Sequence, residues 1–414
     1  MAGKARHARL TRVPVVPSLI AMTVATRKIA VIGGGLGGLA AALALHRAGF
    51  DVDVYEQAPE LNEVGGGINM GPNAARILYR LGLGDALDRA AVRPESAYVR
   101  RWDDGRTLQK APLNPRCVEL YGAPHLTAHR ADLQRIIAAG LPRERIHLDH
   151  RLTGVVDRGD GVEAKFADGN RIVTDILVGA DGIHSTVRTL LFGAEEPNFA
   201  GCVAYRGLVP VERIADLGLE RGNHSWLGPG GHLVHYFVSG GRLLNFVGWT
   251  EHDTWNREDW TDRATIERAL VAFAGWHPQV RRIISDADTC FIWALFDRDP
   301  LPKWSAGRVT LLGDACHPMY PFMAQGAAQA IEDGACLAAL LAKGGDPVET
   351  LRRYEQTRLP RVTRLQQMSR ANKHRYHMQD GPEQIERDAA MVANRERSPE
   401  TMQWLFGFDA SVVD

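Results

Sequence analysis

Three glycines and one carboxylate near the start of the chain have the spacing of a dinucleotide-binding turn. Gly33, Gly35 and Gly38 directly follow an apolar run, and Glu56 closes the next apolar run. The first glycine of such a turn permits a tight bend, the second lets a pyrophosphate approach the backbone, and the third lets the helix pack against the strand. The carboxylate then binds a ribose hydroxyl group. The pattern predicts a nucleotide cofactor, NAD or FAD, and does not distinguish the two.

The composition of the chain indicates which classes of binding partner are not expected. Lys plus Arg and Asp plus Glu both number 49, so no excess of charge indicates nucleic acid or an acidic membrane as a partner. The five cysteines are scattered without a CxxC pair, which is typical of a reducing cytosol and disfavours a zinc site or a disulfide framework. No apolar stretch reaches membrane-spanning length. We expect a cytoplasmic chain with no metal centre.

The elements around the glycine turn read as a β-α-β unit over residues 28–57. Residues 65–73 predict a loop that leads into a helix. A further helix is expected to begin at Arg130, because the apolar residues after it keep helical spacing. Residues 176–179 and 309–314 predict buried strands, each running into a turn that contains glycine and aspartate.

The pattern changes between about residues 193 and 306 to alternating β segments rich in Trp, His and Gly. Segments 232–238 and 242–249 flank a Ser-Gly-Gly turn and predict a hairpin. Long helices are expected from about Gln325 and over residues 349–376. A nucleotide-binding domain is therefore expected to be interrupted by a β-rich insertion and then resumed.

Three motifs carry a family resemblance when they are taken in order. They are Gly33-x-Gly35-x-x-Gly38, the segment GADGIHSTVR at residues 179–188 and the segment GDACHP at residues 313–318. With Gln325-Gly326 and Glu332-Asp333, they resemble the single-component FAD-dependent aromatic hydroxylases, or group A flavoprotein monooxygenases. The branch that contains salicylate hydroxylase and 6-hydroxynicotinate 3-monooxygenase is the most similar. The resemblance runs from about Lys28 to the C-terminus.

The resemblance implies an α/β fold with a Rossmann-like FAD-binding domain of the glutathione-reductase type. The expected division is a disordered or mis-annotated extension at 1–26, a first FAD-binding part at 27–192, a β-rich substrate domain at 193–306, an FAD-binding return at 307–345 and a C-terminal helical region at 346–414. Met22 stands just before the first strand, so translation of residues 1–21 is left open.

The resemblance also implies roles at the flavin. Glu56 would hold the adenosine ribose, Arg130 would place a cation near the flavin phosphates, and Asp314 would accept hydrogen bonds from the ribityl chain. Backbone near Leu152 would lie beside the adenine, and a helix N-cap is the competing role for Asp314. The expected FAD-binding residues are Gly33, Gly35, Gly38, Glu56, Gln57, Arg130, Leu152, Asp181, Asp314, Gln325, Gly326 and Ala327.

The family reaction reduces FAD with NADH or NADPH, and O2 then forms a flavin C4a-hydroperoxide that hydroxylates a phenolic ring. Asp181 and Arg188 belong to the segment that the family uses for both FAD and the nicotinamide nucleotide. No second glycine fingerprint is present, which is normal in this family, and the choice between NADH and NADPH stays open. The implied partners are a small aromatic substrate and O2, in a monomer or a homodimer.

A general base is wanted because ring attack is faster when the substrate phenol is ionised. His232 and Tyr236 share one face of a predicted strand, and His235 lies on the other face. A strand rise of about 3.3 Å per residue sets the first two roughly 13 Å apart at Cα, so they can bracket a small ring. A strand histidine is more often structural, but the resemblance places the pocket here. We therefore expect His232 as the base and Tyr236 as a residue that orients the ring or its carboxylate.

Departures from the family pattern bear on the substrate. The 6-hydroxynicotinate enzymes characteristically carry histidines where this chain has Asn69 and Phe322. Asn69 cannot act as a base at neutral pH, and Phe322 makes its end of the pocket apolar. Arg206 is a candidate partner for a carboxylate, and equally a salt-bridging strand residue. We expect a salicylate-type or hydroxybenzoate-type hydroxylase. The alternatives are a hydroxypyridine hydroxylase, a flavin epoxidase or N-hydroxylase, and a non-catalytic FAD-binding redox sensor.

Overall fold

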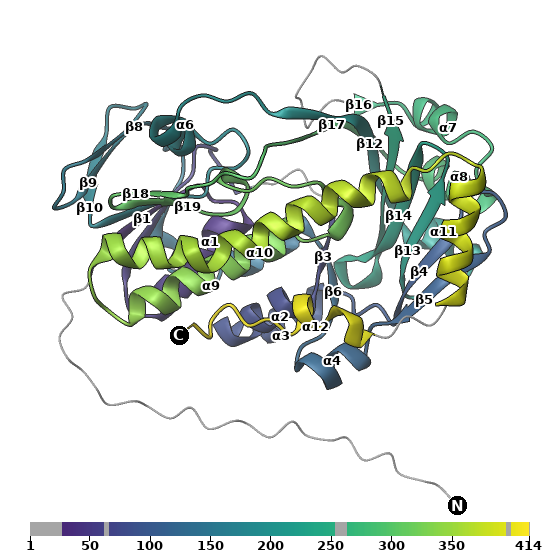
Figure 1. Cartoon of the computed structure of the whole chain (residues 1–414), viewed down its shortest axis with the longest axis horizontal. Coiled ribbons are helices and arrows are strands. Elements are labelled where there is room, and N and C mark those ends of the chain that lie inside the picture. The colour runs from purple at the N-terminus through teal and green to yellow at the C-terminus, as the bar shows by residue number, and fades with distance from the viewer. Residues whose placement is uncertain (1–26, 62–65, 253–262, 395–398, 414) are drawn as a thin grey trace, which may run out of the picture.

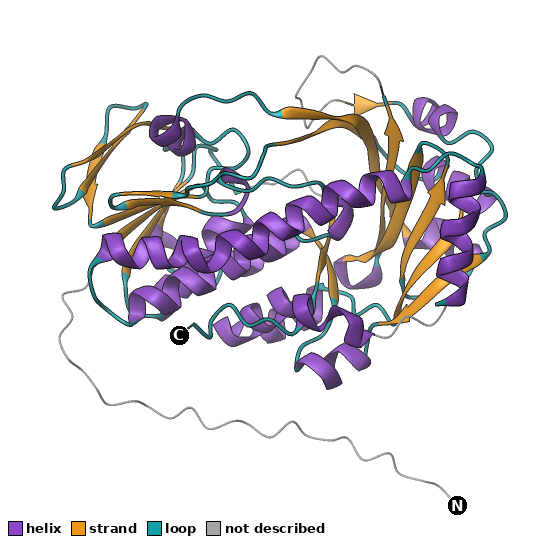
Figure 2. Cartoon of the chain, in the orientation of Figure 1, coloured by secondary structure: helices purple, strands orange, loops and turns teal. Residues whose placement is uncertain are grey.

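Two large β-sheets, joined by a long helix that runs across the molecule, organise the chain (Figure 1). The computed structural model describes residues 27–61, 66–252, 263–394 and 399–413. The predicted extension at 1–26 lies outside the described residues. The α/β architecture expected from the sequence is confirmed, with helices and strands interleaved along the chain (Figure 2).

The first sheet is the predicted nucleotide-binding sheet, and its central strands are parallel. Its apolar residues are buried on both faces, as parallel strands that are covered on both sides require. In spatial order it contains β18 (Ser305–Ala306), β19 (Val309–Leu311), β11 (Ile176–Gly179), β1 (Lys28–Ile32), β2 (Asp51–Tyr55) and β7 (Ile146–His147). A separate three-stranded sheet consists of β8 (Leu152–Asp157), β9 (Val162–Phe166) and β10 (Arg171–Thr174).

Two helices, α1 (Leu36–Arg47) and α9 (Gly326–Ala342), pack closely against each other beside this sheet. A Cβ atom on Gly334 would lie 2.6 Å from the Cα of Ala41, so only glycine allows the backbones to approach this closely. Both helices are rich in alanine, which keeps the approach short along their length. The close pairing brings the start of α9 to the same end of the sheet as the start of α1.

The second sheet is largely antiparallel and contains the predicted hairpin. In spatial order it consists of β16 (Arg263–Ala264), β17 (Cys290–Asp297), β12 (Asn198–Pro210), β15 (Leu243–Glu251), β14 (Gly231–Val238), β13 (Asn223–Gly228), β4 (Ser96–Arg101) and β5 (Thr107–Pro112). Strand β4 pairs in parallel with β13, so a hairpin from residues 96–112 completes a sheet otherwise built from residues 198–297.

The remaining helices link and flank the sheets. α10 (Pro347–Tyr376) has 30 residues and packs against both α9 and the loop before it, and α11 (Pro382–Ala393) packs on β5. The others are α2 (Pro72–Leu78), α3 (Gly84–Ala90), α4 (Arg116–Tyr121), α5 (Arg130–Ala138), α6 (Thr186–Phe192), α7 (Ile266–Ala272), α8 (Pro278–Ser285) and α12 (Gln403–Phe406). Within the described residues, no helix has the length and apolar character needed to cross a bilayer.

One local expectation differs from the structure. Within residues 65–73, predicted as a loop, the chain forms β3 (Gly67–Met70), which pairs with β6 (Leu126–His129). The partner strand lies about 60 residues away in the sequence, so local patterning carries little information about the pairing. The pairing fixes Gly67 and Asn69 in position above the second sheet, next to the start of α5 at Arg130.

Candidate active site

The glycine turn has the tight backbone that its spacing predicts. Gly33 adopts a φ of +111°, and a Cβ atom there would lie 2.4 Å from the carbonyl oxygen of Ala180. A Cβ atom on Gly38 would lie 2.0 Å from the carbonyl oxygen of Gly33. Gly35 is the N-cap of α1 and makes no side-chain capping hydrogen bond. The N-terminus of α1 is therefore a suitable site for an anion such as a pyrophosphate.

Glu56 lies at the end of β2 and reaches the glycine turn. Its Oε2 accepts a hydrogen bond from the Gly34 amide at 2.6 Å, and its Oε1 accepts one from Ala58 at 2.8 Å. The amide of His150 donates to the Glu56 carbonyl at 2.8 Å, so the segment leading to Leu152 runs beside Glu56 and Gln57. This segment is where the resemblance places the adenosine.

The second motif uses its carboxylate internally. Asp181 accepts hydrogen bonds from the Ser185 hydroxyl and from the Val187 amide, so its side chain faces the first turn of α6. Burial raises the pKa of Asp181. Arg188 is buried and pairs with Glu195. This segment meets the glycine turn through Ala180 and the backbone amide of Asp181.

Asp314 stands at the start of α9. It is exposed although Gly313 and Ala315 on either side are buried, and its Oδ1 lies 3.9 Å from the Cβ position of Gly326. The N-cap of α9 is Gln325, so Asp314 lies beside the helix N-terminus and does not occupy its capping position. Gly326 and Ala327 form the first turn of the helix.

A buried network of ion pairs and hydrogen bonds supports the backbone at Gly313, next to Asp314. Asp333 accepts hydrogen bonds from the Gly313 amide at 3.0 Å, from His317 Nε2 at 2.6 Å and from Arg358 Nε at 2.7 Å. Arg358 also donates to Glu332 at 2.6 Å, and both residues are fully buried. Asp333 has its pKa lowered to about 2: burial opposes this shift, but His317 and Arg358 outweigh it. The network leaves His317 in a structural position.

These features together fit FAD. At Gly33 and Gly38 there is no room for a side chain, so a pyrophosphate can approach the backbone at the start of α1. Glu56 reaches the same turn from the end of β2. Asp314 supplies an exposed carboxylate at the start of α9. Among the residues that the structure describes, no cluster of His, Cys, Asp or Glu could hold a metal ion.

A central row of side chains crosses one face of the second sheet. Arg206 on β12 pairs with Val247 on β15, and Val247 pairs with Val234 on β14. Directly paired residues of neighbouring strands lie on the same face of a sheet, about 5 Å apart. All three are partly exposed, although most residues of these strands are buried. The guanidinium of Arg206 also lies 4.2 Å from the ring centre of Trp293.

Buried rows close the central row on both sides. His232 pairs with Trp249 on one side, and Tyr236 pairs with Asn245 on the other. The alternation predicted for β14 is confirmed, because His235 on the opposite face stacks on His224 with ring centres 4.7 Å apart. His232 and Tyr236 therefore flank the central row on its two sides.

Two segments of the first domain lie over this face. Phe322 contacts the His232 ring edge-on, with ring centres 5.1 Å apart, and lies 5.4 Å from the Trp249 ring. At the other end, the Gly67 amide donates to Asn245 Oδ1 at 2.6 Å, and a Cβ atom on Gly67 would lie 2.5 Å from Tyr236. The carbonyl of Gly66, the residue before Gly67, accepts a hydrogen bond from the backbone amide of Arg130 at 3.0 Å.

Asn69 belongs to a polar cluster beside Tyr236. Its Oδ1 accepts a hydrogen bond from Asn223 Nδ2 at 2.7 Å and lies 3.2 Å from His125 Nε2. Burial lowers the pKa of His125 to about 4, so the ring is neutral at pH 7. Asn223 Oδ1 has no hydrogen-bond partner within the described residues. The cluster of Asn69, His125 and Asn223 is therefore polar and uncharged at pH 7.

Burial also determines the protonation states of His232 and Tyr236 on β14. Desolvation lowers the pKa of His232 well below its ordinary value, with a smaller contribution from His377, and raises the pKa of Tyr236. His232 is therefore a neutral imidazole at pH 7, which is the form that can accept a proton. The near-neutral pKa wanted for a base does not hold for His232 in the absence of substrate, because aromatic rings exclude water from it.

The comparisons with known proteins agree with this geometry. The family model described as FAD binding domain matches residues 26–369. The chain is 45% identical over 387 residues to 3-amino-4-hydroxybenzoate 2-monooxygenase PtnB3 of Streptomyces platensis, which covers 93% of this chain and 97% of the relative. It is 41% identical to 6-hydroxynicotinate 3-monooxygenase of Bordetella bronchiseptica, over 83% of this chain and 91% of that one.

A solved structure supports the same assignment. Klebsiella pneumoniae HpxO, in complex with FAD and uric acid, superposes with a TM-score of 0.82 at 30% identity, over 92% of this chain and 96% of that one. The chain belongs to the FAD binding domain family. It is an FAD-dependent aromatic monooxygenase, and the resemblance expected from the three motifs is confirmed.

Sequence reasoning missed several residues of this monooxygenase face. Trp249 and Asn245 could have been found, because the predicted hairpin sets them opposite His232 and Tyr236. Asn223 and His377 gave no local signal. His377 is 145 residues from its hydrogen-bond partner His232 in the sequence.

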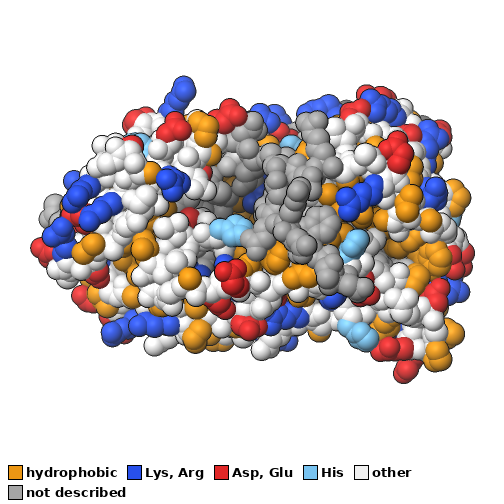
Figure 3. All heavy atoms as spheres, turned by 90° about the horizontal axis from the view of Figure 1, so that it is seen from above, with side chains coloured by type: hydrophobic (Ala, Val, Ile, Leu, Met, Phe, Trp, Pro, Cys, Tyr) orange, Lys and Arg blue, Asp and Glu red, His pale blue; other side chains and the backbone are white. Residues whose placement is uncertain are grey.

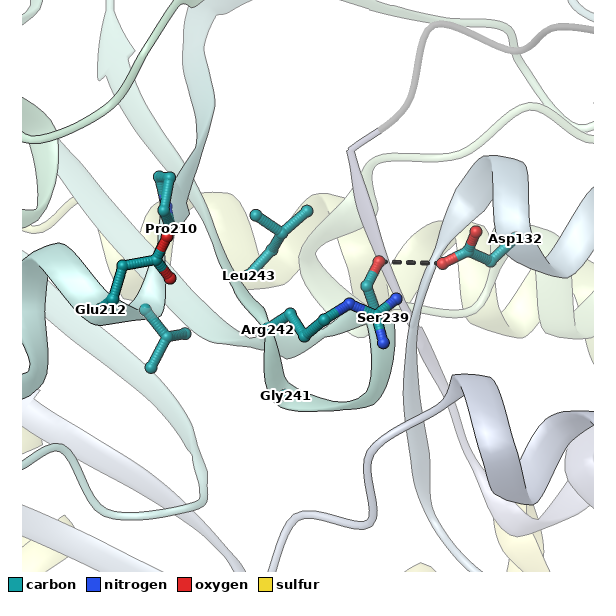
Figure 4. Close-up of a pocket in the computed structure, with 8 residues that line it drawn as sticks. Asp132, Pro210, Glu212, Ser239, Gly241, Arg242 and Leu243 are labelled. Carbon is teal, nitrogen blue, oxygen red and sulfur yellow. Dashed lines mark hydrogen bonds between the residues drawn. The ribbon is translucent and has the colours of Figure 1, made fainter.

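The surface of the monooxygenase also carries a hollow of about 600 Å³ at the far end of β14 from His232 (Figure 4). Asp132, Glu212 and Arg242 line it, and Ser239 donates a hydrogen bond to Asp132 at 2.8 Å. None of the sequence-predicted site residues lines this hollow. Among the described residues on the face shown in Figure 3, cationic and anionic side chains are interspersed.

Proposed function

We propose that this monooxygenase hydroxylates a benzenoid ring that carries a carboxylate and a phenolic hydroxyl group. The observation that carries the proposal is the central row of Arg206, Val247 and Val234, open between the buried ends at His232 and Tyr236. A flat ring can lie on the two valines, with its carboxylate toward the guanidinium. Apolar walls with few polar groups are typical of small-molecule sites.

The cofactor would be held by the glycine turn, Glu56 and Asp314. When bound, FAD supplies the transfer of electrons from the nicotinamide nucleotide and the activation of O2. The N-terminus of α9 would face the flavin with its positive end. NADH is the reductant that we expect, from the family resemblance.

The remaining work falls to side chains of the chain itself. His232 would accept the phenolic proton at Nε2, since Nδ1 already shares a hydrogen bond with His377 at 2.8 Å. Phe322 and Trp249 would exclude water from the reacting ring. Tyr236 would remain protonated and donate a hydrogen bond to the substrate, because burial raises its pKa.

Among substrates of this class, we propose 3-amino-4-hydroxybenzoate as the first to test. The relative named for that activity is 45% identical over nearly its whole length. Asn223 Oδ1 is an acceptor that lacks a donor within the described residues, and an amino substituent on the ring can supply one. Salicylate and 3-hydroxybenzoate share the carboxylate and hydroxyl groups but lack the amino group, so the hydroxyl group is their only hydrogen-bond donor once the carboxylate is ionised.

The test is a substrate panel with the FAD-loaded enzyme and either NADH or NADPH. The panel contains 3-amino-4-hydroxybenzoate, 3-hydroxybenzoate, salicylate and 6-hydroxynicotinate. Hydroxylated product is measured by chromatography with mass spectrometry, and peroxide is measured in parallel because uncoupled turnover also consumes the reductant. Efficient hydroxylation of 6-hydroxynicotinate, with none of the benzenoid acids converted, would overturn the proposal.

A further inference from the structure

A second histidine lies directly behind His232. His377 follows the last residue of α10, and its Nε2 lies 2.8 Å from Nδ1 of His232. His377 is 3% exposed and His232 is 2% exposed, so the hydrogen bond is shielded from water. No residue that the structure describes makes a hydrogen bond to Nε2 of His232. Nδ1 of His232 is therefore engaged with His377, whereas Nε2 is left for the proposed substrate.

The other ring nitrogen of His377 leads to the surface. Its Nδ1 lies 3.6 Å from Oε1 of Glu251 and has no hydrogen-bond partner among the described side chains. The Glu251 side chain is 45% exposed, whereas the His377 side chain is 1% exposed. Backbone bonds fix the arrangement, since the Gly230 amide donates to the His377 carbonyl at 3.1 Å and the Glu251 amide donates to the Gly230 carbonyl at 2.9 Å.

The charged groups around His377 leave it neutral at pH 7. Burial, and secondarily Lys373 on the same helix, lower the pKa of His377 to about 3. Other charged side chains nearby are engaged elsewhere: Lys373 donates to the Ala200 carbonyl, and His374 pairs with Glu383 at 2.9 Å. From α11, Arg387 donates to the Arg375 carbonyl at 2.8 Å. Glu251 is the carboxylate that faces the ring of His377.

We propose that His377 and Glu251 form a proton path that connects His232 to solvent. The proposal rests on the proposed role of His232 as the base. One proton leaves the phenolic oxygen and binds Nε2 of His232, while the proton on Nδ1 of His232 passes to Nε2 of His377. The proton on Nδ1 of His377 then passes to Glu251 and to water. One proton enters and one leaves, and both imidazoles end neutral with their tautomers exchanged.

The path answers a physical need of the buried base. An imidazolium held among Phe322, Tyr376 and Trp249 has lost its water and is strongly disfavoured. If His232 gives up the proton on Nδ1 as it accepts one at Nε2, the positive charge of an imidazolium does not build up on its ring. His377 is thus a positioning and relay residue that acts through His232, and Glu251 is the exit to solvent.

The test measures ionisation of a bound phenol, with no turnover. Oxidised, FAD-loaded enzyme is mixed rapidly with 3-amino-4-hydroxybenzoate in dilute buffer without NADH, and the ultraviolet absorbance of the phenolate is followed. The variants are His377→Phe, which keeps the ring volume, Glu251→Gln and Glu251→Asp. His374→Gln is the matched control, because this histidine lies on the same helix and its side chain is 70% exposed.

We expect His377→Phe to slow ionisation by about tenfold or more, a smaller loss than the roughly 10²–10⁴-fold of a group that takes the proton directly, because His377 acts through His232. Added imidazole should restore the rate, and Glu251→Asp should be faster than Glu251→Gln. An unchanged rate in His377→Phe, or a slow rate that imidazole does not restore, would overturn the path. If the wild-type enzyme itself does not ionise the bound phenol, the proposed role of His232 fails first, and that result is visible before any substitution.

Discussion

The two ring nitrogens of His232 have different neighbours. Nδ1 shares a hydrogen bond with His377, Nε2 makes no hydrogen bond to a residue that the structure describes, and the residue lies on the face that carries the central row. His235 directly follows Val234 in the strand, but its side chain lies on the opposite face and stacks on His224. The same residue type, three positions apart on one strand, therefore lies on the face of the proposed substrate site in one case and in a stacked pair on the opposite face in the other.

Replacement of His232 tests its proposed role directly. We expect His232→Ala to lower the rate of hydroxylation by about 10²-fold or more, because general-base catalysis contributes on that scale. FAD should remain bound, since His232 lies in the second sheet, away from the glycine turn. Product formation and flavin absorbance are measured from pH 6 to pH 9. Near-normal turnover across that range would remove His232 from the mechanism.

Asp314 is a residue whose role should appear in binding. We expect Asp314→Ala to weaken FAD binding by about tenfold or more, because a charge-assisted hydrogen bond contributes roughly 1.5–3 kcal/mol. Flavin fluorescence on titration of the apoprotein gives the dissociation constant. Asp288→Ala is a suitable control, because the Asp288 side chain is 59% exposed and pairs with Arg213, away from the glycine turn and α9. Unaltered FAD affinity in Asp314→Ala contradicts the assigned role.

At the scale of elements, α9 and α10 are joined by charges that have no access to water. Arg358 of α10 binds Glu332 and Asp333 of α9, and all three side chains are fully buried. Removing one partner of such a group leaves an uncompensated buried charge. The consequence reaches the flavin site, because Asp333 also accepts the hydrogen bond of the Gly313 amide beside Asp314.

We therefore expect Arg358→Met to lower the free energy of unfolding by about 3–5 kcal/mol. Denaturant unfolding of the FAD-loaded enzyme, followed by circular dichroism, measures the change. Arg352→Met is the matched control on the same helix, because Arg352 pairs with Glu349 at the surface and is 64% exposed. Equal stability of the two variants would contradict the structural role given to the network.

The elements also show what the sequence could and could not predict. The glycine turn, the strand at 176–179 and the hairpin around residues 239–241 were predictable because their signals are local. Strand β3 and the contact between His232 and His377 depend on partners about 60 and 145 residues away, which spacing along one segment does not reveal. The candidate site was therefore predictable in its cofactor turn and its central strand, but not in what lies behind that strand.

At the scale of the whole molecule, buried neutral histidines make stability depend on pH. Burial lowers the pKa of His125 and of His224 to about 4, whereas an unfolded chain protonates both near pH 6.5. Between these values the unfolded state binds more protons than the folded state. The stability that they contribute is complete above pH 6.5 and is lost as the pH falls toward 4.

We expect the free energy of unfolding to decrease from pH 7 to pH 5, by roughly 1.4 kcal/mol per pH unit for each such histidine once the pH is well below 6.5. Urea unfolding at saturating FAD measures the slope. His224→Gln should reduce the slope by close to one proton, while His374→Gln should leave it unchanged because that side chain is exposed. A stability that is constant over this range would contradict the prediction.

The hairpin β4–β5 has a consequence for how this enzyme can be recombined with its relatives. Its residues lie in the sequence before the three-stranded sheet, yet β4 completes the sheet that carries the central row. A chimera that exchanges only residues 198–297 for those of another hydroxylase would pair a foreign β13 with the resident β4. To transfer substrate preference, residues 96–112 and 198–297 should therefore be exchanged together. A sheet that is one unit in space is thus encoded by two separate segments of the sequence.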